Sequence, residues 1–204
     1  MKNRLNHQPS FEAVYAMDNL YSAWHKVSLG KSSKHSIMEF YRSLDANLES
    51  IADDLCKGAY LPGSYNRFLI KDPKERMISA STVRDRVVQH ALMNYYAPVF
   101  DRHLIFDCYA CRIGKGTHKA VLRAFHFAKS TRYFLKIDMR KYFDSIDHAI
   151  LKNLLVKIIK ESDILRLFNI IIDSGDVCTG KGIPIGNLSS QYFANFYLSS
   201  FPTW

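Results

Sequence analysis

A short apolar segment that ends in a single carboxylate constrains this chain most strongly. Residues 133–138 read YFLKID, so aromatic and branched side chains lead directly into Asp138. Such a pattern predicts a β-strand that carries an acidic side chain at its end. Carboxylates fixed at strand ends can hold divalent cations, because these hard ions prefer oxygen ligands. The alternative is that Asp138 caps a turn after a buried strand, as Asp commonly does.

Glycine and proline near the carboxyl end impose a second constraint. Residues 180–187 read GKGIPIGN, and the two inner glycines and the proline exclude a regular helix or strand there. An amphipathic helix capped by Asn187 or Ser189 is expected to follow. A glycine loop that leads into a helix N-terminus can approach a bound nucleotide closely.

Together these two segments resemble motifs A and B of reverse transcriptases. Upstream, residues 71–92 and 107–121 resemble the two fingers motifs of the same family. The resemblance covers nearly the whole chain from about Leu20. It implies the fingers and an incomplete palm of a right-hand polymerase, an α+β fold with much more helix than strand.

The glycine loop also indicates a subfamily. Most reverse transcriptases carry Gln before the motif B glycine, whereas here Ile185 precedes Gly186, and Gln191 follows two serines. This loop is similar to that of the reverse transcriptases of diversity-generating retroelements, and residues 18–31 resemble theirs too. The resemblance then implies a template RNA copied into cDNA with frequent errors at adenines. It also implies a partner, a small basic accessory variability protein.

The resemblance assigns roles to individual residues. The Asp138 carboxylate and the Met139 carbonyl would bind Mg²⁺, or Mn²⁺ in its place. Phe143 would lie under the sugar of the incoming deoxynucleoside triphosphate, unless it is a core aromatic. Further nucleotide contacts are expected from residues of the first fingers motif and the loop: Lys71, Arg76, Ile185, Gly186 and Gln191.

Basic side chains of the fingers are expected to contact the template. These are Arg84, Arg86, Arg112 and Lys115. The arginines could instead pair with Asp85 and Asp107, a choice that the sequence leaves open. Lys and Arg number 28 against 19 Asp and Glu, and the resulting net charge of +9 suits template RNA with its primer or cDNA.

Apolar residues at helical spacing predict the rest of the architecture. The expected helices span about residues 11–27, 40–55, 83–98, 121–128, 146–158 and 165–175, with one more after Asn187. We expect an N-terminal helical segment over residues 1–60, fingers over 61–132 and the incomplete palm over 133–204. No apolar run approaches the roughly 20 residues that span a bilayer, and no signal peptide is visible. A bacterial or phage cytoplasmic setting without membrane contact is therefore expected.

Reverse transcriptases complete their metal site with a Tyr-x-Asp-Asp hairpin after motif B. The pair Asp53-Asp54 lies before motif A and within a helical stripe, so we assign it to a solvated helix face. The resemblance stops near Ser199, so we expect the catalytic hairpin and the thumb to be missing and the chain to be inactive alone. Two alternatives remain: a reverse transcriptase of another bacterial lineage, such as a group II intron maturase or a defence-associated enzyme, and a non-enzymatic RNA-binding remnant.

Overall fold

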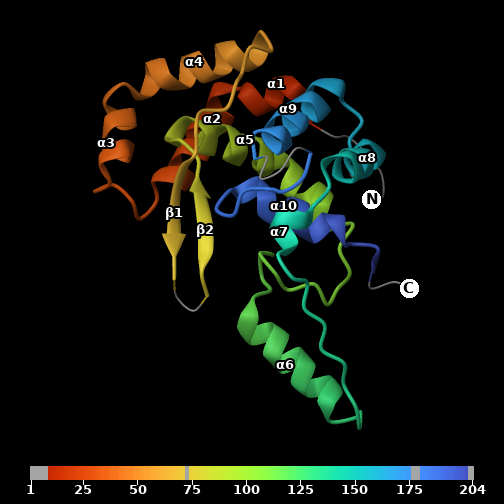
Figure 1. Ribbon diagram of the computed structural model, residues 1–204. Helices are drawn as coiled ribbons and strands as arrows, with labels where there is room; N and C mark the ends of the chain where they lie inside the picture. The colour runs from red at the N-terminus through yellow and green to blue at the C-terminus, as the bar shows by residue number, and fades with distance from the viewer. Residues whose placement is uncertain (1–8, 72–73, 176–179, 202–204) are drawn as a thin grey trace.

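The computed structural model describes residues 9–71, 74–175 and 180–201 of the chain, shown in Figure 1. Within them the structure is a helix-rich α+β fold with one two-stranded sheet, which confirms the expected fold class. The elements, in chain order, are α1 Phe11–Tyr15, α2 Met17–Ser28, α3 His35–Arg42, α4 Leu44–Cys56, β1 Asn66–Ile70, β2 Arg76–Ala80, α5 Val83–Asp101, α6 Thr117–Ala128, α7 Tyr142–Ser145, α8 His148–Ile158, α9 Ser162–Asp173 and α10 Leu188–Tyr197.

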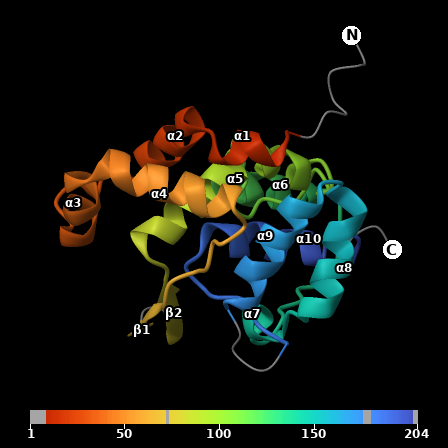
Figure 2. The ribbon, with the colours of Figure 1, turned by 90° about the horizontal axis from the view of Figure 1, so that it is seen from above.

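Helix α5 is the centre of the packing, in contact with both α2 and α10. Figure 2 shows it between the N-terminal helices and the C-terminal ones. Tyr96 and Phe100 of α5 meet Phe168 of α9 edge to face, with ring centroids 5.7 and 5.8 Å apart. Phe193 of α10 joins the same cluster at 5.6 Å from Phe168. Burying each such ring stabilises the fold by about 1.5–3 kcal/mol, so this cluster joins α5, α9 and α10.

Two of the expected helices are each divided in two. The N-terminal helix is interrupted at Ala16, where the side-chain amide of Asn19 donates to the Val14 carbonyl at 2.8 Å. The helix expected over residues 40–55 is interrupted at Ser43, and there the Asn47 amide donates to the Phe40 carbonyl at 2.9 Å. In both places a side chain takes the role of the missing helical N–H donor, so the chain can turn without leaving a buried carbonyl unpaired.

The expected end of α5 near Pro98 is wrong, because the helix continues to Asp101. Val99 is 5% exposed and Phe100 is fully buried, so the core holds the extra turn in place. The turn is also closed by hydrogen bonds, since the ring of His103 contacts the Val99 carbonyl at 2.8 Å. Packing therefore outweighs the helix-breaking tendency of proline here.

The antiparallel hairpin of β1 and β2 was not among the expected elements. Its register pairs Asn66 with Ala80 and Ile70 with Arg76. All of β1 is exposed, and on β2 the buried residue is Ser79. The hairpin projects from the helical body beside the start of α5 (Figure 1).

The strand expected over residues 133–138 is not formed. This segment is irregular and exposed, and Phe134 is 92% exposed. It runs with α6 away from the helical body (Figure 1), and α6 itself has no buried residue. A strand needs a neighbour to bond with its N–H and C=O groups, and among the described residues the one sheet is the β1–β2 hairpin.

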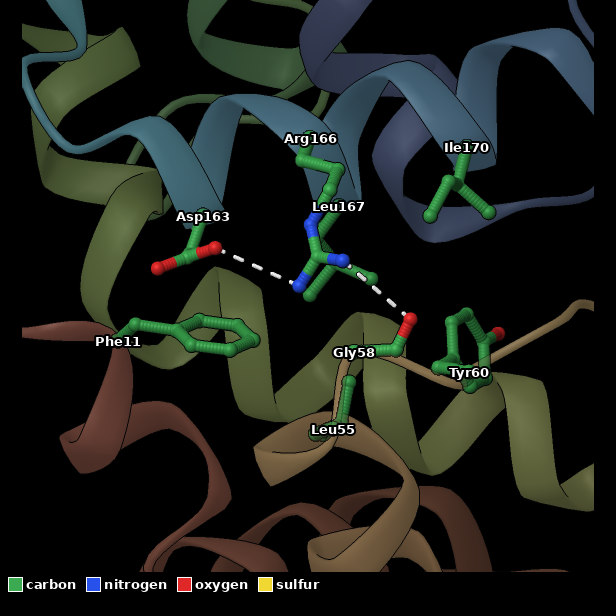
Figure 3. Close-up of a pocket in the computed structure, with 8 residues that line it drawn as sticks. All are labelled: Phe11, Leu55, Gly58, Tyr60, Asp163, Arg166, Leu167 and Ile170. Carbon is green, nitrogen blue, oxygen red and sulfur yellow. Dashed lines mark hydrogen bonds and ion pairs between the residues drawn. The ribbon is translucent and has the colours of Figure 1, made fainter.

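A glycine terminates α4. Gly58 has a φ of +65°, the left-handed conformation that favours glycine after a helix. Arg166 of α9 lies over it, donates to the Gly58 carbonyl at 3.3 Å and pairs with Asp163 at 3.4 Å (Figure 3). A methyl group at Gly58 would overlap the guanidinium. The pocket at this contact encloses about 10 Å³, room for roughly one water molecule.

No helix in the described part of the chain is both long enough and apolar enough to cross a membrane.

Candidate functional site

The segment that follows Asp138 and the glycine loop form one hydrogen-bonded unit. The Gly182 N–H donates to the Ile146 carbonyl at 2.8 Å, and the Ile183 N–H donates to the Phe143 carbonyl at 3.0 Å. An isolated antiparallel bridge between Asp147 and Lys181 extends the contact. Two segments that lie about 40 residues apart in the chain are therefore fixed against each other by their main chains.

The same loop also reaches the hairpin. The Ser79 N–H of β2 donates to the Ile185 carbonyl at 2.8 Å. Gly186, with a φ of +123°, lies so near β2 that a Cβ there would be 3.0 Å from the Ser79 carbonyl oxygen and 3.1 Å from Cγ2 of Ile78. Only glycine suits this position without strain or displacement of the strand.

The loop leads into α10, as predicted, and Asn187 is the N-cap residue. Its side chain does not cap the helix but donates to the Tyr65 hydroxyl at 2.8 Å. Two residues later, the buried Ser189 hydroxyl donates to Oε1 of Gln89 on α5 at 3.3 Å. The residues after the loop are therefore anchored in the core, whereas Gln191 is exposed.

A basic groove opens beside this unit. It has a volume of about 900 Å³ and lies between α3, the hairpin, the start of α5 and Gly186. Among its described lining residues, Glu39 is the one carboxylate, against the cations of Lys31, Lys34, Arg84 and Arg86.

Two basic side chains in or near the groove are disfavoured in their charged forms. Burial lowers the pKa of Arg86 from its usual value, because the charged guanidinium loses hydration. Burial and the nearby charges of Lys26, Lys31 and Arg86 lower the pKa of His90 to about 4. An anion placed beside Arg86 in the groove would favour its charged form.

The structure answers the question of which carboxylates pair with the arginines. Arg84 contacts Asp54 and lies over the ring of Tyr60, 5.1 Å from its centroid. Asp85 instead accepts hydrogen bonds from three neighbours: the Tyr60 hydroxyl at 2.8 Å, the Thr82 hydroxyl at 2.7 Å and the Gly63 N–H at 3.1 Å. The alternative in which an arginine forms an ion pair with Asp85 is therefore not observed.

Of the four residues predicted to contact the template, Arg112 forms the most hydrogen bonds within the chain. Its side chain is 11% exposed, and its Nε and Nη2 contact both oxygens of Asp101 at 2.6 and 3.1 Å. Its Nη1 donates to the carbonyls of Ile105 and Cys108 at 2.8 and 3.0 Å. Asp107 pairs with Arg123 at 2.8 Å, an arginine that was not considered for it.

Lys115 lies within the second fingers motif and is also held by local contacts. Its Nζ donates to the Phe106 carbonyl at 2.7 Å. The same ammonium lies 3.4 Å from the ring centroid of Phe106 and 4.8 Å from that of Tyr109. The glycines on both sides, Gly114 and Gly116, have positive φ and form the expected turn before α6.

The residues predicted to hold Mg²⁺ are exposed. Asp138 and Met139 lie on the irregular segment after residue 133. Nowhere in the described ranges do three or more His, Cys, Asp or Glu side chains gather as a metal ion would need. The described residues thus supply one predicted carboxylate, Asp138, and do not by themselves form a complete site for the ion.

The other predicted nucleotide contacts lie on separate elements. Phe143 is half-buried on α7, with its ring 6.0 Å from that of Tyr142. Arg76 is the first residue of β2, and Lys71 directly follows β1. Both side chains are exposed. Exposure is compatible with a nucleotide contact and equally with an ordinary surface charge.

The Asp53-Asp54 pair lies on α4, as the helical spacing predicted. Asp53 pairs with Lys57 one turn along at 2.6 Å, and Asp54 contacts Arg84. Both carboxylates therefore serve ion pairs of the helical body.

Three residues of the site escaped the sequence reasoning. Lys31 and Lys34 lie in the polar stretch between the first two expected helices, and their positive charge is the signal that could have predicted a contact with an anion. Ser79 acts through its backbone N–H, and no side-chain pattern can reveal such a contact.

Comparison with known proteins identifies the family. Residues 70–204 match the family model described as reverse transcriptase (RNA-dependent DNA polymerase). The chain is 25% identical over 171 residues to Protein YkfC of Escherichia coli (strain K12), covering 78% of this chain and 45% of that protein. It is 26% identical over 197 residues to the group II intron-encoded protein LtrA of Lactococcus lactis subsp. cremoris, covering 90% and 31%.

Among solved structures, a chain of the partial Cas6-RT-Cas1–Cas2 complex has a TM-score of 0.61 at 18% identity, covering 95% of this chain and 34% of that one. This likeness shows the fold alone. The chain spans less than half the length of each of these relatives. Because the family model matches more than half of the chain, the chain belongs to the reverse transcriptase family.

Proposed function

We propose that this chain supplies the fingers and part of the palm of an RNA-directed DNA polymerase, which copies template RNA into cDNA from deoxynucleoside triphosphates. One observation carries the proposal. The glycine loop is bonded both to the segment after Asp138 and to β2, and Gly186 lines a basic groove. A phosphoryl-transfer site needs this combination of close backbone approach and positive charge.

The nucleotide would meet the loop where it crosses β2. Gly186 packs closely against β2 and lines the groove there, and the half-buried Ile185 lies next to it. Lys71 and Arg76, at adjoining ends of the hairpin strands, would contact the triphosphate, and Phe143 would lie under the sugar. Gln191, exposed on α10, completes the predicted set.

The template would follow the basic groove. Arg84 and Arg86 line it and keep their proposed role as phosphate contacts. Arg112 and Lys115 would need to exchange their internal partners for phosphates, so we expect them to contribute less to RNA binding. Most of the affinity would be electrostatic and insensitive to sequence.

Asp138 and the Met139 carbonyl would provide one part of the Mg²⁺ or Mn²⁺ site. When bound, the ion supplies positive charge at the reacting phosphate. We predict that Asp138→Asn removes primer extension, at least a hundredfold, in a version of the chain completed with the remaining palm and thumb of a reverse transcriptase. RNA binding should stay within about twofold, because the basic groove is untouched.

Primer extension on an RNA template and filter binding measure these two quantities. Asp144→Asn, on the exposed face of α7, is the matched control and should extend primers normally. Extension by the Asp138→Asn protein within tenfold of the parent would show that the metal site is wrongly placed.

Within the family, the Ile185, Gly186 and Gln191 loop supports a diversity-generating retroelement as the source, with its small accessory partner. The similarity to the group II intron-encoded protein LtrA supports the alternative of a group II intron lineage, and the Cas6-RT-Cas1–Cas2 structure resembles the chain in fold. A pair of near-identical DNA repeats that differ at adenines, next to the coding sequence, would identify the source as a diversity-generating retroelement. The bacterial or phage cytoplasmic setting stays a prediction.

A further inference from the structure

His148, the first residue of α8, contacts the glycine loop twice. Its backbone N–H donates to the Gly180 carbonyl at 3.0 Å, and its ring Nε2 lies 2.7 Å from the Gly182 carbonyl oxygen. The residue is 4% exposed. A buried imidazole nitrogen requires a partner, so this contact cannot be given up without a cost in stability.

The other side of the ring faces α9. Nδ1 lies 3.3 Å from Oδ1 of Asp173, and both oxygens of that carboxylate accept from Nζ of Lys152, at 2.6 and 2.8 Å. A carbonyl oxygen can only accept, so Nε2 carries the hydrogen in the bond to Gly182. The ring is thus fixed between a charged pair on α8 and α9 and the main chain of the loop.

The residues that follow Gly182 in the loop are held by a series of further contacts. Gly182 also donates to the Ile146 carbonyl, and Ile183 donates to the Phe143 carbonyl. Pro184 then packs against Gly175, where a side chain larger than hydrogen would overlap it. Ile185, the next residue, is the one that bonds to β2.

We propose that His148 is a positioning residue for the glycine loop, holding it so that Ile185 and Gly186 stay against β2. Neither the family match nor the roles predicted above assign it any part. The effect on the loop stands independently of the enzyme activity, whereas its consequence for nucleotide binding rests on the proposed function.

Hydrogen exchange of the full chain tests the effect on the loop directly. The Gly182 and Ile183 amides report on it, because each is bonded across to the 143–148 segment. His148→Leu, which removes both ring contacts, should speed their exchange about tenfold or more. His148→Gln keeps an N–H donor that can reach the Gly182 carbonyl and should exchange at nearly the parent rate.

Two controls separate positioning from general destabilisation. Amides of α2, far from the ring in the sequence and packed on α5, should keep their parent rates in every variant. His126→Gln on the exposed face of α6 should change nothing. Leu and Gln variants that exchange alike at Gly182 and Ile183, or an unchanged rate in the Leu variant, would overturn the proposal.

Steady-state polymerase kinetics provide a second test. In the completed enzyme, His148→Leu should raise KM for deoxynucleoside triphosphates about tenfold, with a smaller change in kcat, and His148→Gln should restore KM. If loop exchange responds as expected but KM does not, the loop is positioned by His148 and the proposed nucleotide site is wrong. If neither responds, the positioning role itself fails.

Discussion

At the scale of single residues, the basic side chains show what sequence reasoning can and cannot provide. Charge and motif context single out Arg84, Arg86 and Arg112, and two of these three line the groove. Packing of α4 against α5 places Asp54 beside Arg84, whereas Arg112 pairs with Asp101 at the end of α5. The partly exposed pair of Arg84 and Asp54 contributes about 1 kcal/mol or less, so ligand phosphates can compete for Arg84.

Ile185 gives a residue-scale prediction. The resemblance to other reverse transcriptases implies glutamine as the usual residue at this position, and an apolar side chain offers the nascent base pair no hydrogen bond. In the completed enzyme, Ile185→Gln should lower misincorporation opposite template adenine roughly fivefold, because one hydrogen bond near the reacting pair is worth about 1 kcal/mol of discrimination. Sequencing of cDNA products measures it.

Ile185→Leu is the control, since it keeps an apolar side chain of the same size and should leave the error spectrum unchanged. An equal or higher adenine error rate in the Gln variant would exclude the role given to this position.

At the scale of elements, the helices were largely predictable because their apolar stripes are local and periodic. The C-terminal helices α8, α9 and α10 lie close to where the spacing placed them. The breaks at Ala16 and Ser43 were not predictable, since each depends on an asparagine folding back onto a carbonyl. The 133–138 strand failed for the opposite reason: its pattern was clear, but a strand exists only with a partner.

The two asparagine-stabilised breaks differ in burial, which leads to an element-scale prediction. Asn19 is 7% exposed; its amide donates to the carbonyls of Val14 and Ala91, and its oxygen accepts from Asn94 at 2.7 Å. Asn47 is only half-buried and donates to a single carbonyl. Asn19→Ala should therefore cost about 2–3 kcal/mol of unfolding free energy, and Asn47→Ala about 1 kcal/mol.

Urea unfolding followed by circular dichroism compares the two variants, with equal slopes required for the comparison. Equal losses, or a larger loss for Asn47→Ala, would show that the buried network around Asn19 does not hold α1 and α2 onto α5.

At the scale of the whole molecule, the described residues provide a surface for binding nucleic acid more completely than a site for metal ions. A groove of about 900 Å³ carries four lysine and arginine side chains, whereas the described residues bring no cluster of metal ligands together. RNA binding needs only the first of these features, and polymerisation needs both.

We therefore predict that residues 1–204 alone bind RNA without extending a primer. Binding should fall steeply with salt and vary little with sequence, because phosphate contacts dominate. Incubation with primed RNA, labelled deoxynucleotides and Mg²⁺ or Mn²⁺ should give no templated product. Charge-reversing substitution of Arg84 and Arg86 should weaken binding more than the same change at Arg112.

Extension that disappears when Asp53 and Asp54 are replaced would contradict both the assignment of that pair to α4 ion pairs and the expected inactivity of the chain. Binding that is indifferent to salt would contradict the groove as the RNA path.

The bond between Ser79 and Ile185 joins main chain to main chain. No side chain takes part, so substitution at residue 185 leaves the attachment of the loop to β2 intact. Under the role proposed for Ile185, copying accuracy would change through this one side chain while the main chain of the loop keeps its place on β2.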